Sequence, residues 1–407
     1  MPVDELAGLS IGARIQTVRE RKGKTRPVVA GLVGRSEEWL KSVERGRRNA
    51  PDVHMLMRLA GVLGVDLAVL VGEQQPPFAL QGRTGHAAVS GVREAIEAPL
   101  LSLAAARPVS ATDLARRVAD AWALWHSSPT PRDAVGAVLP RIITDGRHAA
   151  RSLDGADRRQ AHAALSSAYA LSGQMLAWVA DSALLWLAAD RCMSAAEQAD
   201  EPRALASAAW VVGNVWRSTG REDDALQLAD DAAGLLASAL DGDDDEPRAL
   251  WGAVRAHGAI TAAKMGREGD ALRRLDDAAD MSTRLPSGYA HPATLFGAAN
   301  AALTGVSVQV ELHKGGAAVT TAEAADPDKV PSLDRRARVW LDVARGYRQR
   351  KENTASLHVL QRATRISRES MTCHPLARTL AGELVTSGGS LIEREARALA
   401  TDLGVAV

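Results

Sequence analysis

The chain has 407 residues, and its 49 basic and 49 acidic side chains balance. This length exceeds one ordinary hydrophobic core, so at least two domains are expected. Ala, Leu and Arg dominate while Tyr and Phe are scarce, which favours an all-α fold. Two cysteines are too few for a disulfide framework and indicate a reducing compartment. The sequence lacks a signal-peptide pattern and a long apolar run, so we expect a soluble, cytoplasmic protein without a membrane partner.

The first 75 residues are predicted to fold as five short helices. Ile11, Ile15 and Val18 recur at spacings of four and three, which is typical of one amphipathic helix. Gly23 then ends this helix. Thr25 is a suitable N-cap for a second helix, in which a proline is tolerated in the first turn.

A tight turn at Gly34 separates the second predicted helix from the third. Ser36 can cap this third helix, and Glu37 and Glu38 follow at the positive end of its dipole. Two further short helices complete the region. Short helices with a glycine turn between the second and the third are typical of a helix-turn-helix domain.

Basic side chains gather in this same region. Between Arg14 and Arg48 the sequence holds eleven basic and four acidic residues, an excess of seven positive charges on a neutral chain. A compact basic patch of this kind indicates a polyanionic partner, and we expect double-stranded DNA.

The stretch IGARIQTVRERKGKTRPVVAGLVGRSEEWLKSVERGRR, continued by LMRLAGVLGVDLAVLVG, resembles the Cro/C1-type (XRE) helix-turn-helix domain along its whole length. Its most specific part is LKSVERGRR, which is close to the family pattern L-S-x-I-E-x-G. The resemblance implies that Glu37, Glu38 and Ser42 occupy base-reading positions. It also implies that Glu44 forms an internal ion pair with Arg19 rather than a DNA contact.

The predicted DNA contacts surround the third helix. Arg26 stands where the family usually has a Gln that opens the second helix, and Arg can supply the same contact. The alternative role of Glu37 and Glu38 is stabilisation of the helix dipole alone, and the basic residues could serve solubility only. The full predicted set is Lys24, Arg26, Arg35, Ser36, Glu37, Glu38, Trp39, Lys41, Ser42, Arg45, Arg47 and Arg48.

Residues 76–84 are polar and contain proline and glycine, so they are predicted to link a domain over 1–75 to a second domain over 85–407. The second domain is predicted to consist of successive helices. Its first antiparallel pair is predicted over 113–126 and 132–153.

The second domain also contains internal repeats. The stretch AWVVGNVWRSTGREDDALQLADDA places small and apolar residues as the tetratricopeptide pattern does, and so does VWLDVARGYRQRKENTASLHVLQRA. Weaker copies lie around Tyr169, Ala259 and Gly305. Residues 110–405 therefore resemble a tetratricopeptide-like helical solenoid, whose tryptophans are expected in the core. These are Trp178, Trp186, Trp210, Trp216, Trp251 and Trp340.

In such a solenoid the first helix of each pair lines the concave face. Polar residues there could bind a peptide or small-molecule effector, and the competing interpretation is a solvated inner wall. The candidate ligand-binding residues are Trp210, Asn214, Arg217, Gln309 and Arg345.

The sequence contains no complete motif for catalysis or for cofactor binding. Lys24 and Thr25 follow a glycine, but Val18 stands where a phosphate loop needs its first glycine. The stretch DGDDDE lacks the glycine and the final glutamate of a calcium loop. The histidines show no zinc spacing, and no nucleophile motif is present. We therefore expect a protein that is not an enzyme and has no cofactor or metal.

Two functions fit the sequence. The first is a sequence-specific transcriptional regulator of the actinobacterial type, a homodimer on an inverted repeat, whose repeat domain dimerises and senses an effector. The alternative is a protein-interaction scaffold whose helix-turn-helix domain binds DNA only non-specifically.

Overall fold

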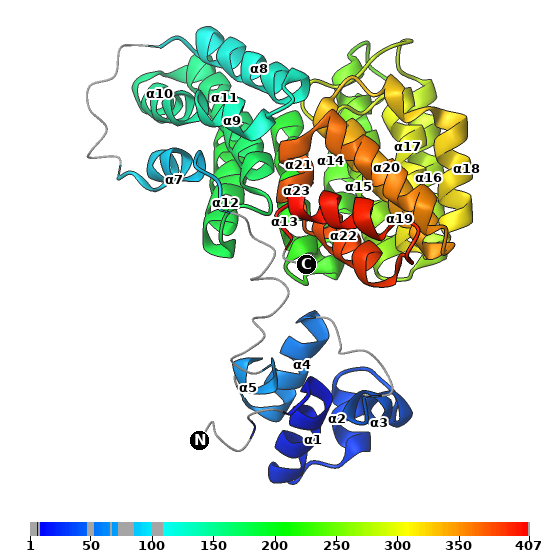
Figure 1. The fold of residues 1–407 in the computed structure, drawn as a ribbon. Helices are drawn as coiled ribbons and strands as arrows, with labels where there is room; N and C mark the ends of the chain where they lie inside the picture. The colour runs from blue at the N-terminus through cyan, green and yellow to red at the C-terminus, as the bar shows by residue number, and fades with distance from the viewer. Residues whose placement is uncertain are drawn as a thin grey trace. The chain divides into compact units, whose positions relative to one another are not determined.

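The computed structural model describes residues 6, 9–46, 53–65, 67–71, 85–99 and 109–405. The chain divides into two compact units, residues 1–83 and 84–407 (Figure 1). The described residues of both units form helices, turns and loops, without a strand among them. Within these residues no helix is long and apolar enough to cross a membrane.

The N-terminal unit contains all five predicted helices. They are α1 (Ile11–Arg21), α2 (Arg26–Leu32), α3 (Glu37–Glu44), α4 (Val53–Leu63) and α5 (Leu67–Val71). Gly23, Gly34 and Gly64 follow α1, α2 and α4 with φ between 63° and 67°, a left-handed conformation that glycine adopts without strain. Thr25 is the N-cap residue of α2 as predicted, but its side chain makes no capping hydrogen bond.

The core of this unit joins all five helices through one apolar cluster, which includes Ile15, Val29, Leu40, Leu59 and Leu70, each fully buried. Helices α1 and α3 approach most closely at Gly12, where an added Cβ would lie 2.1 Å from the carbonyl oxygen of Val43. Only glycine permits this contact, so Gly12 sets the distance between α1 and α3.

A buried carboxylate fixes the end of α3. The Glu44 side chain is fully buried, and Arg19 donates to it through Nε at 2.6 Å and through Nη2 at 3.1 Å. Arg26 donates to the same carboxylate through Nε at 2.6 Å. The Glu44 hydrogen bond raises the pKa of Arg19. The predicted pair of Arg19 and Glu44 is thus confirmed, and Arg26 is a second partner that the sequence did not indicate.

The C-terminal unit begins with α7 (Val89–Glu97), α8 (Ala111–Ser127), α9 (Pro131–Gly136) and α10 (Leu139–Ser152). The predicted single helix over 132–153 is wrong, because a turn between α9 and α10 interrupts the helix. Pro140 lies in the first turn of α10, where its missing N–H and fixed φ are tolerated, whereas a helix interior would not accept it.

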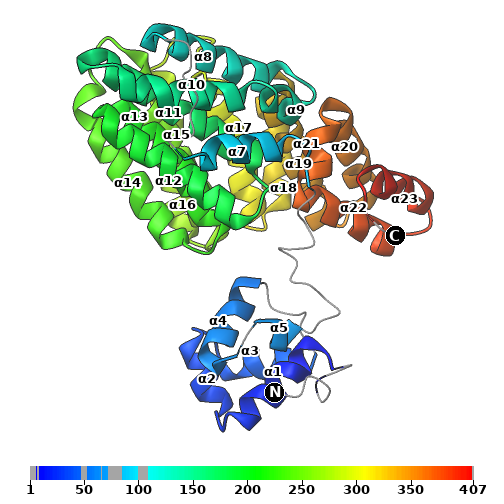
Figure 2. The same cartoon turned by 90° about the vertical axis from the view of Figure 1, so that its left-hand side faces the viewer.

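Successive helix pairs then form the repeat domain (Figure 2). The first members are α11 (Gly155–Leu176), α13 (Pro202–Ser218), α15 (Asp245–Lys264), α17 (Ala298–Glu311) and α19 (Leu333–Gln349). Their partners are α12 (Ser182–Ala199), α14 (Glu222–Leu236), α16 (Glu268–Thr283), α18 (Gly315–Ala325) and α20 (Asn353–Ile366). Each repeat predicted from the sequence coincides with one of these pairs. The chain ends with α21 (Arg368–Cys373), α22 (Pro375–Ser387) and α23 (Glu393–Asp402).

The early helices of this unit contact the late ones. Helix α8 contacts α19, and α9 contacts α21. His126 of α8 bonds through Nε2 to the Pro292 carbonyl oxygen at 2.9 Å and through Nδ1 to Ser332 Oγ at 3.1 Å. Ser367 Oγ donates to the Pro129 carbonyl oxygen at 3.0 Å. These bonds between residues far apart in sequence close the helical array on itself.

All six tryptophans expected in the core of the repeat domain are half-buried. Five of them pack against its buried apolar clusters, so the prediction is right only in part; these are Trp186, Trp210, Trp216, Trp251 and Trp340. Arginine guanidinium groups cover several of these rings. Arg221 lies 4.3 Å from the centre of Trp216, Arg338 lies 4.4 Å from Trp178, and a third arginine covers Trp340. A cation over an indole face gives a favourable partner to a ring that apolar side chains do not fully enclose.

The carboxylate of Glu44 generates a stability prediction. Glu44→Gln should lower the free energy of unfolding of the N-terminal unit by about 3–5 kcal/mol, because two guanidinium groups then lose a buried counter-charge. Hydrogen–deuterium exchange of the α1 and α3 amides in the full chain measures the change. Glu37→Gln, at an exposed position of the same helix, is the matched control and should change stability by less than about 0.5 kcal/mol. A Glu44→Gln protein with unchanged exchange but lost DNA binding would contradict this role.

Candidate nucleic-acid interface

Helix α3 presents a polar face away from the core. Leu40 and Val43 are buried, whereas Glu37 and Glu38 are exposed and Ser42 is half-buried. This separation follows from the spacing of the apolar residues, which places them on one side of the helix. The exposed side chains can accept hydrogen bonds from base edges, as a recognition helix does in the major groove.

The N-terminus of α3 is capped as the sequence predicted. Ser36 Oγ accepts a hydrogen bond from the backbone N–H of Trp39 at 3.2 Å. Glu38 pairs with Lys41 one turn later at 3.2 Å, and both side chains remain accessible. The capped terminus also leaves backbone N–H groups near the exposed end of the helix, a typical site for a phosphate.

A shallow groove lies beside this terminus. Its lining residues are Gly31, Gly34, Arg35, Ser36, Glu38, Trp39 and Ser42. The guanidinium of Arg35 is 5.7 Å from the centre of the Trp39 ring, and Trp39 is half-buried. The structure thus brings five predicted DNA contacts together with Gly31 of α2 and Gly34 of the turn, which the sequence did not assign to the site.

Two other predicted contacts have internal partners. Lys24 donates through Nζ to the Val62 carbonyl oxygen at 2.5 Å, in the last turn of α4. Arg26 donates to Glu44 through Nε. Both residues therefore brace the domain, and their roles at DNA stay predictions. Arg45 is exposed at the end of α3, whereas Arg47 and Arg48 lie outside the described residues.

The candidate ligand-binding residues of the repeat domain lie on first helices, as expected. Asn214 and Arg217 are neighbours on α13, where Arg217 donates to the Asn214 side-chain oxygen at 2.6 Å and to Thr261 Oγ1 at 3.3 Å. Asn214 donates in turn to the Trp210 carbonyl oxygen at 3.3 Å. Both polar atoms of the Asn214 side chain are thus engaged inside the domain, so a peptide backbone would have to compete for them.

The other two candidates lie on α17 and α19. Gln309 Oε1 is buried and has no hydrogen-bond partner among the described residues. Arg345 donates to Glu311 and to Asp342, each at 2.9 Å. A buried acceptor without a hydrogen bond destabilises the fold. Of these two residues, Gln309 is therefore the one whose side-chain oxygen would gain a hydrogen bond from a bound donor.

Two arginines of the same interior were not predicted. Arg335 donates to Asn300 at 3.1 Å, and Arg338 lies near Asp334 and Trp178. Burial lowers the pKa of Arg217 and of Arg335 to about 10, and the positive charges of Arg335 and Arg338 contribute to the shift of Arg217. Arg217 of α13 and Arg335 of α19 therefore lie close enough to repel each other, and their guanidinium groups remain charged at neutral pH.

The sequence contains a signal for this cluster. Arg335, Arg338, Asp342 and Arg345 follow one another at spacings of three, four and three, which places them on one face of α19. That pattern identifies a charged helix face, but it does not say that another helix carries Arg217 towards it.

Two solved structures cover most of the chain at low identity. One is the crystal structure of Bacillus thuringiensis PlcR in complex with the peptide PapR7 and DNA, at 10% identity and a TM-score of 0.30, covering 91% of this chain and 98% of that chain. The other is ComR from S. thermophilus in complex with DNA and its signalling peptide ComS, at 13% identity and a TM-score of 0.22, covering 97% and 100%. Chains with such TM-scores do not superpose closely.

The match to a sequence family lies in the N-terminal unit. Residues 10–71 match the family described as a helix-turn-helix domain. The immunity repressor protein of Bacillus phage phi105 is 32% identical over 66 residues, which is 16% of this chain and 45% of the repressor, so the chain spans less than half of that relative. The uncharacterized HTH-type transcriptional regulator y4dJ of Sinorhizobium fredii is 43% identical over 61 residues, 15% of this chain and 78% of that protein. Since most of the second relative is matched, the chain belongs to the helix-turn-helix transcriptional regulators.

Proposed function

We propose that the protein is a sequence-specific regulator of the Cro/C1 type, which acts in the cytoplasm and reads DNA with α3. The observation that carries the proposal is the exposed polar face of α3 beside the groove of Arg35 and Trp39. Glu37, Glu38 and Ser42 contact base edges, while Arg35, Lys41 and Arg45 contact phosphates. A scaffold with a vestigial domain has no need for a capped helix that keeps such a face outward.

The phosphate contacts predict a steep dependence on salt. Affinity of the full chain for its site should fall by orders of magnitude between about 50 and 200 mM salt. Arg35→Ala should reduce the slope of log K against log salt by about one, since one phosphate contact is lost. The matched control is Arg394→Ala, at an exposed arginine of α23, which should leave the slope unchanged. Weak binding of equal strength to every sequence would support the scaffold instead.

The domain alone supplies too little surface for high specificity, since single modules bury roughly 600–1,000 Å². We infer that the protein acts as a homodimer held by its repeat domain, which is of the tetratricopeptide type, and most oligomers of one chain are symmetric. A two-fold axis then places two α3 helices on an inverted repeat.

This arrangement predicts half-sites about 10–10.5 bp apart, or a multiple of that spacing. Light scattering of the protein–DNA complex and a footprint on the same DNA together test it. A monomer that protects one asymmetric half-site would exclude the dimer. A dimer whose protected sequence lacks inverted symmetry would exclude the two-fold readout only.

The interior of the repeat domain supports a second role, the sensing of an effector. Arg217 on α13 and Arg335 on α19 are half-buried cations that lie close enough to repel each other. We infer that the effector is a peptide or small molecule with a carboxylate, which relieves the repulsion between them. It changes DNA binding only as far as it favours one conformation of the repeats over another.

A matched pair of peptide pools tests the effector. Random heptapeptides with free carboxyl ends should raise the melting temperature of the full chain, whereas the same pool with amidated ends should not, because it lacks the terminal carboxylate. Arg217→Gln should abolish the difference, and Arg397→Gln, at an exposed arginine of α23, should keep it. Equal shifts from both pools would contradict a carboxylate-binding interior.

A further inference from the structure

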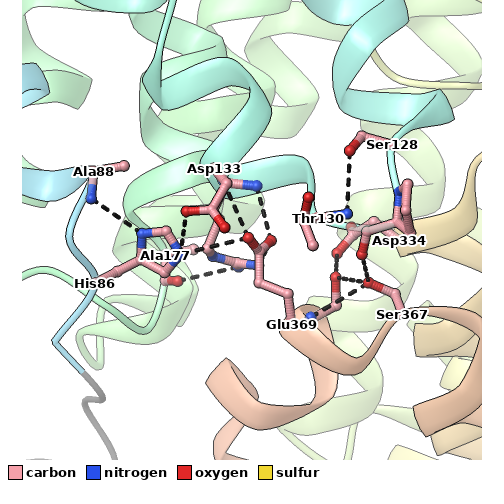
Figure 3. A network of polar contacts seen from close by, with 12 residues as sticks. His86, Ala88, Ser128, Thr130, Asp133, Ala177, Asp334, Ser367 and Glu369 are labelled. Carbon is pink, nitrogen blue, oxygen red and sulfur yellow. Dashed lines mark hydrogen bonds and ion pairs between the residues drawn. The ribbon is translucent and has the colours of Figure 1, made fainter.

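Three potential metal ligands converge where the early and late helices of the repeat domain meet. His86 precedes α7, Asp133 belongs to α9, and Glu369 belongs to α21 (Figure 3). His86 Nε2 lies 3.4 Å from Glu369 Oε1 and 3.6 Å from Asp133 Oδ1. The three ligand atoms lie within 4.8 Å of one another. The three residues are far apart along the chain, so local sequence patterns do not reveal this cluster.

The distances from His86 fit a shared cation better than direct contact. They exceed the 2.7–3.2 Å that is usual for an N–H···O hydrogen bond. Around a tetrahedral zinc ion with ligand bonds of about 2.0–2.2 Å, two ligand atoms lie roughly 3.3–3.6 Å apart. A mixed set of one imidazole and two carboxylates suits zinc and its neighbours among the divalent transition metals.

The surroundings orient the Glu369 carboxylate. Its Oε2 accepts a hydrogen bond from the Arg132 backbone N–H at 2.8 Å, and its Oε1 accepts one from the Asp133 backbone N–H at 3.1 Å. Each oxygen keeps a second lone pair, and the lone pair of Oε1 is available on the side of His86. Hydrogen bonds of this kind commonly hold a ligating carboxylate in place.

Charge and access also favour a cation. The Arg132 guanidinium lies 3.9 Å from Glu369 Oε2 and compensates one of the two carboxylates. With a neutral imidazole the cluster therefore keeps one net negative charge. The side chains of His86 and Glu369 are 13% and 10% exposed, whereas Asp133 is 65% exposed. An ion can thus enter past Asp133, and water can complete its coordination.

One hydrogen bond opposes metal binding. The Ala88 backbone N–H donates to His86 Nδ1 at 3.3 Å, so the neutral imidazole carries its proton on Nε2 (Figure 3). A metal on Nε2 moves that proton to Nδ1 and breaks the Ala88 contact. Since this hydrogen bond is long, the free energy lost with it is smaller than the free energy gained from the metal–ligand bonds.

We propose that His86, Asp133 and Glu369 bind one divalent transition-metal ion of the zinc class. The ion ties the segment before α7 to α9 and α21. The ion therefore strengthens the contact of α9 and of the segment before α7 with α21. This would be a regulatory input separate from DNA binding and from the proposed effector of the repeat domain.

The test uses the full-length protein, stripped with a chelator and titrated with Zn²⁺ by isothermal calorimetry. Wild type should bind one ion per chain at this site. His86→Gln and Asp133→Asn should each weaken that binding at least tenfold. Asp133→Asn is the cleaner of the two because this side chain is largely exposed. The controls are His358→Gln and Asp157→Asn, at exposed positions, the second in the first turn of α11 as Asp133 is in that of α9.

Hydrogen–deuterium exchange with Zn²⁺ locates the ion independently of affinity. Zinc should slow amide exchange in residues 85–97, 131–136 and 368–373 of wild type and of both controls, but not of Asp133→Asn. The proposal is overturned if wild type binds no zinc, or if Asp133→Asn binds it as tightly and with the same protection. It is overturned equally if the protected amides lie elsewhere.

Discussion

A carboxylate excluded from water needs positive partners, and in the N-terminal unit this requirement determines how the helices meet. Glu44 at the end of α3 is satisfied by Arg19 of α1 and Arg26 of α2. Any rotation of α3 about its axis would bury an uncompensated charge, at a cost of several kcal/mol. The close approach at Gly12 fixes the same helix at a second point. With α3 held in this way, Glu37 and Ser42 must lie on the outer face, where a DNA base can reach them.

Partly buried charge also shapes the repeat domain. Burial lowers the pKa of Arg217 and of Arg335 to about 10. Their hydrogen-bond partners Asn214 and Asn300 are neutral, and the nearby carboxylates of Glu311, Asp334 and Asp342 offset part of the repulsion between the cations. The proposed effector carboxylate would offset more of it, whereas the charges of Glu44, Arg19 and Arg26 are already paired within the N-terminal unit.

The sequence predicted what depends on neighbours along the chain. Helix ends at Gly23 and Gly34, the cap at Ser36 and the helix pairs of the repeats follow from local spacing, and the structure has them. The pair of Arg19 and Glu44 came from the family resemblance. Contacts set by tertiary packing were missed: Arg26 turns inward to Glu44, and arginines cover several of the half-buried tryptophans of the repeats. His86, Asp133 and Glu369 could not be grouped, because only the closure of the helical array brings them together.

On the proposed function, the outer face of α3 reads bases while its buried end only holds the helix. Selection of DNA from a random pool, with wild type, Glu37→Ala and Ser42→Ala compared at one salt concentration, tests this division of roles. Wild type should enrich one motif, and each variant, still folded, should change the preferred base at one or two positions of it, since direct contacts specify bases. If both variants enrich the wild-type motif unchanged, or if wild type enriches none, α3 does not read sequence.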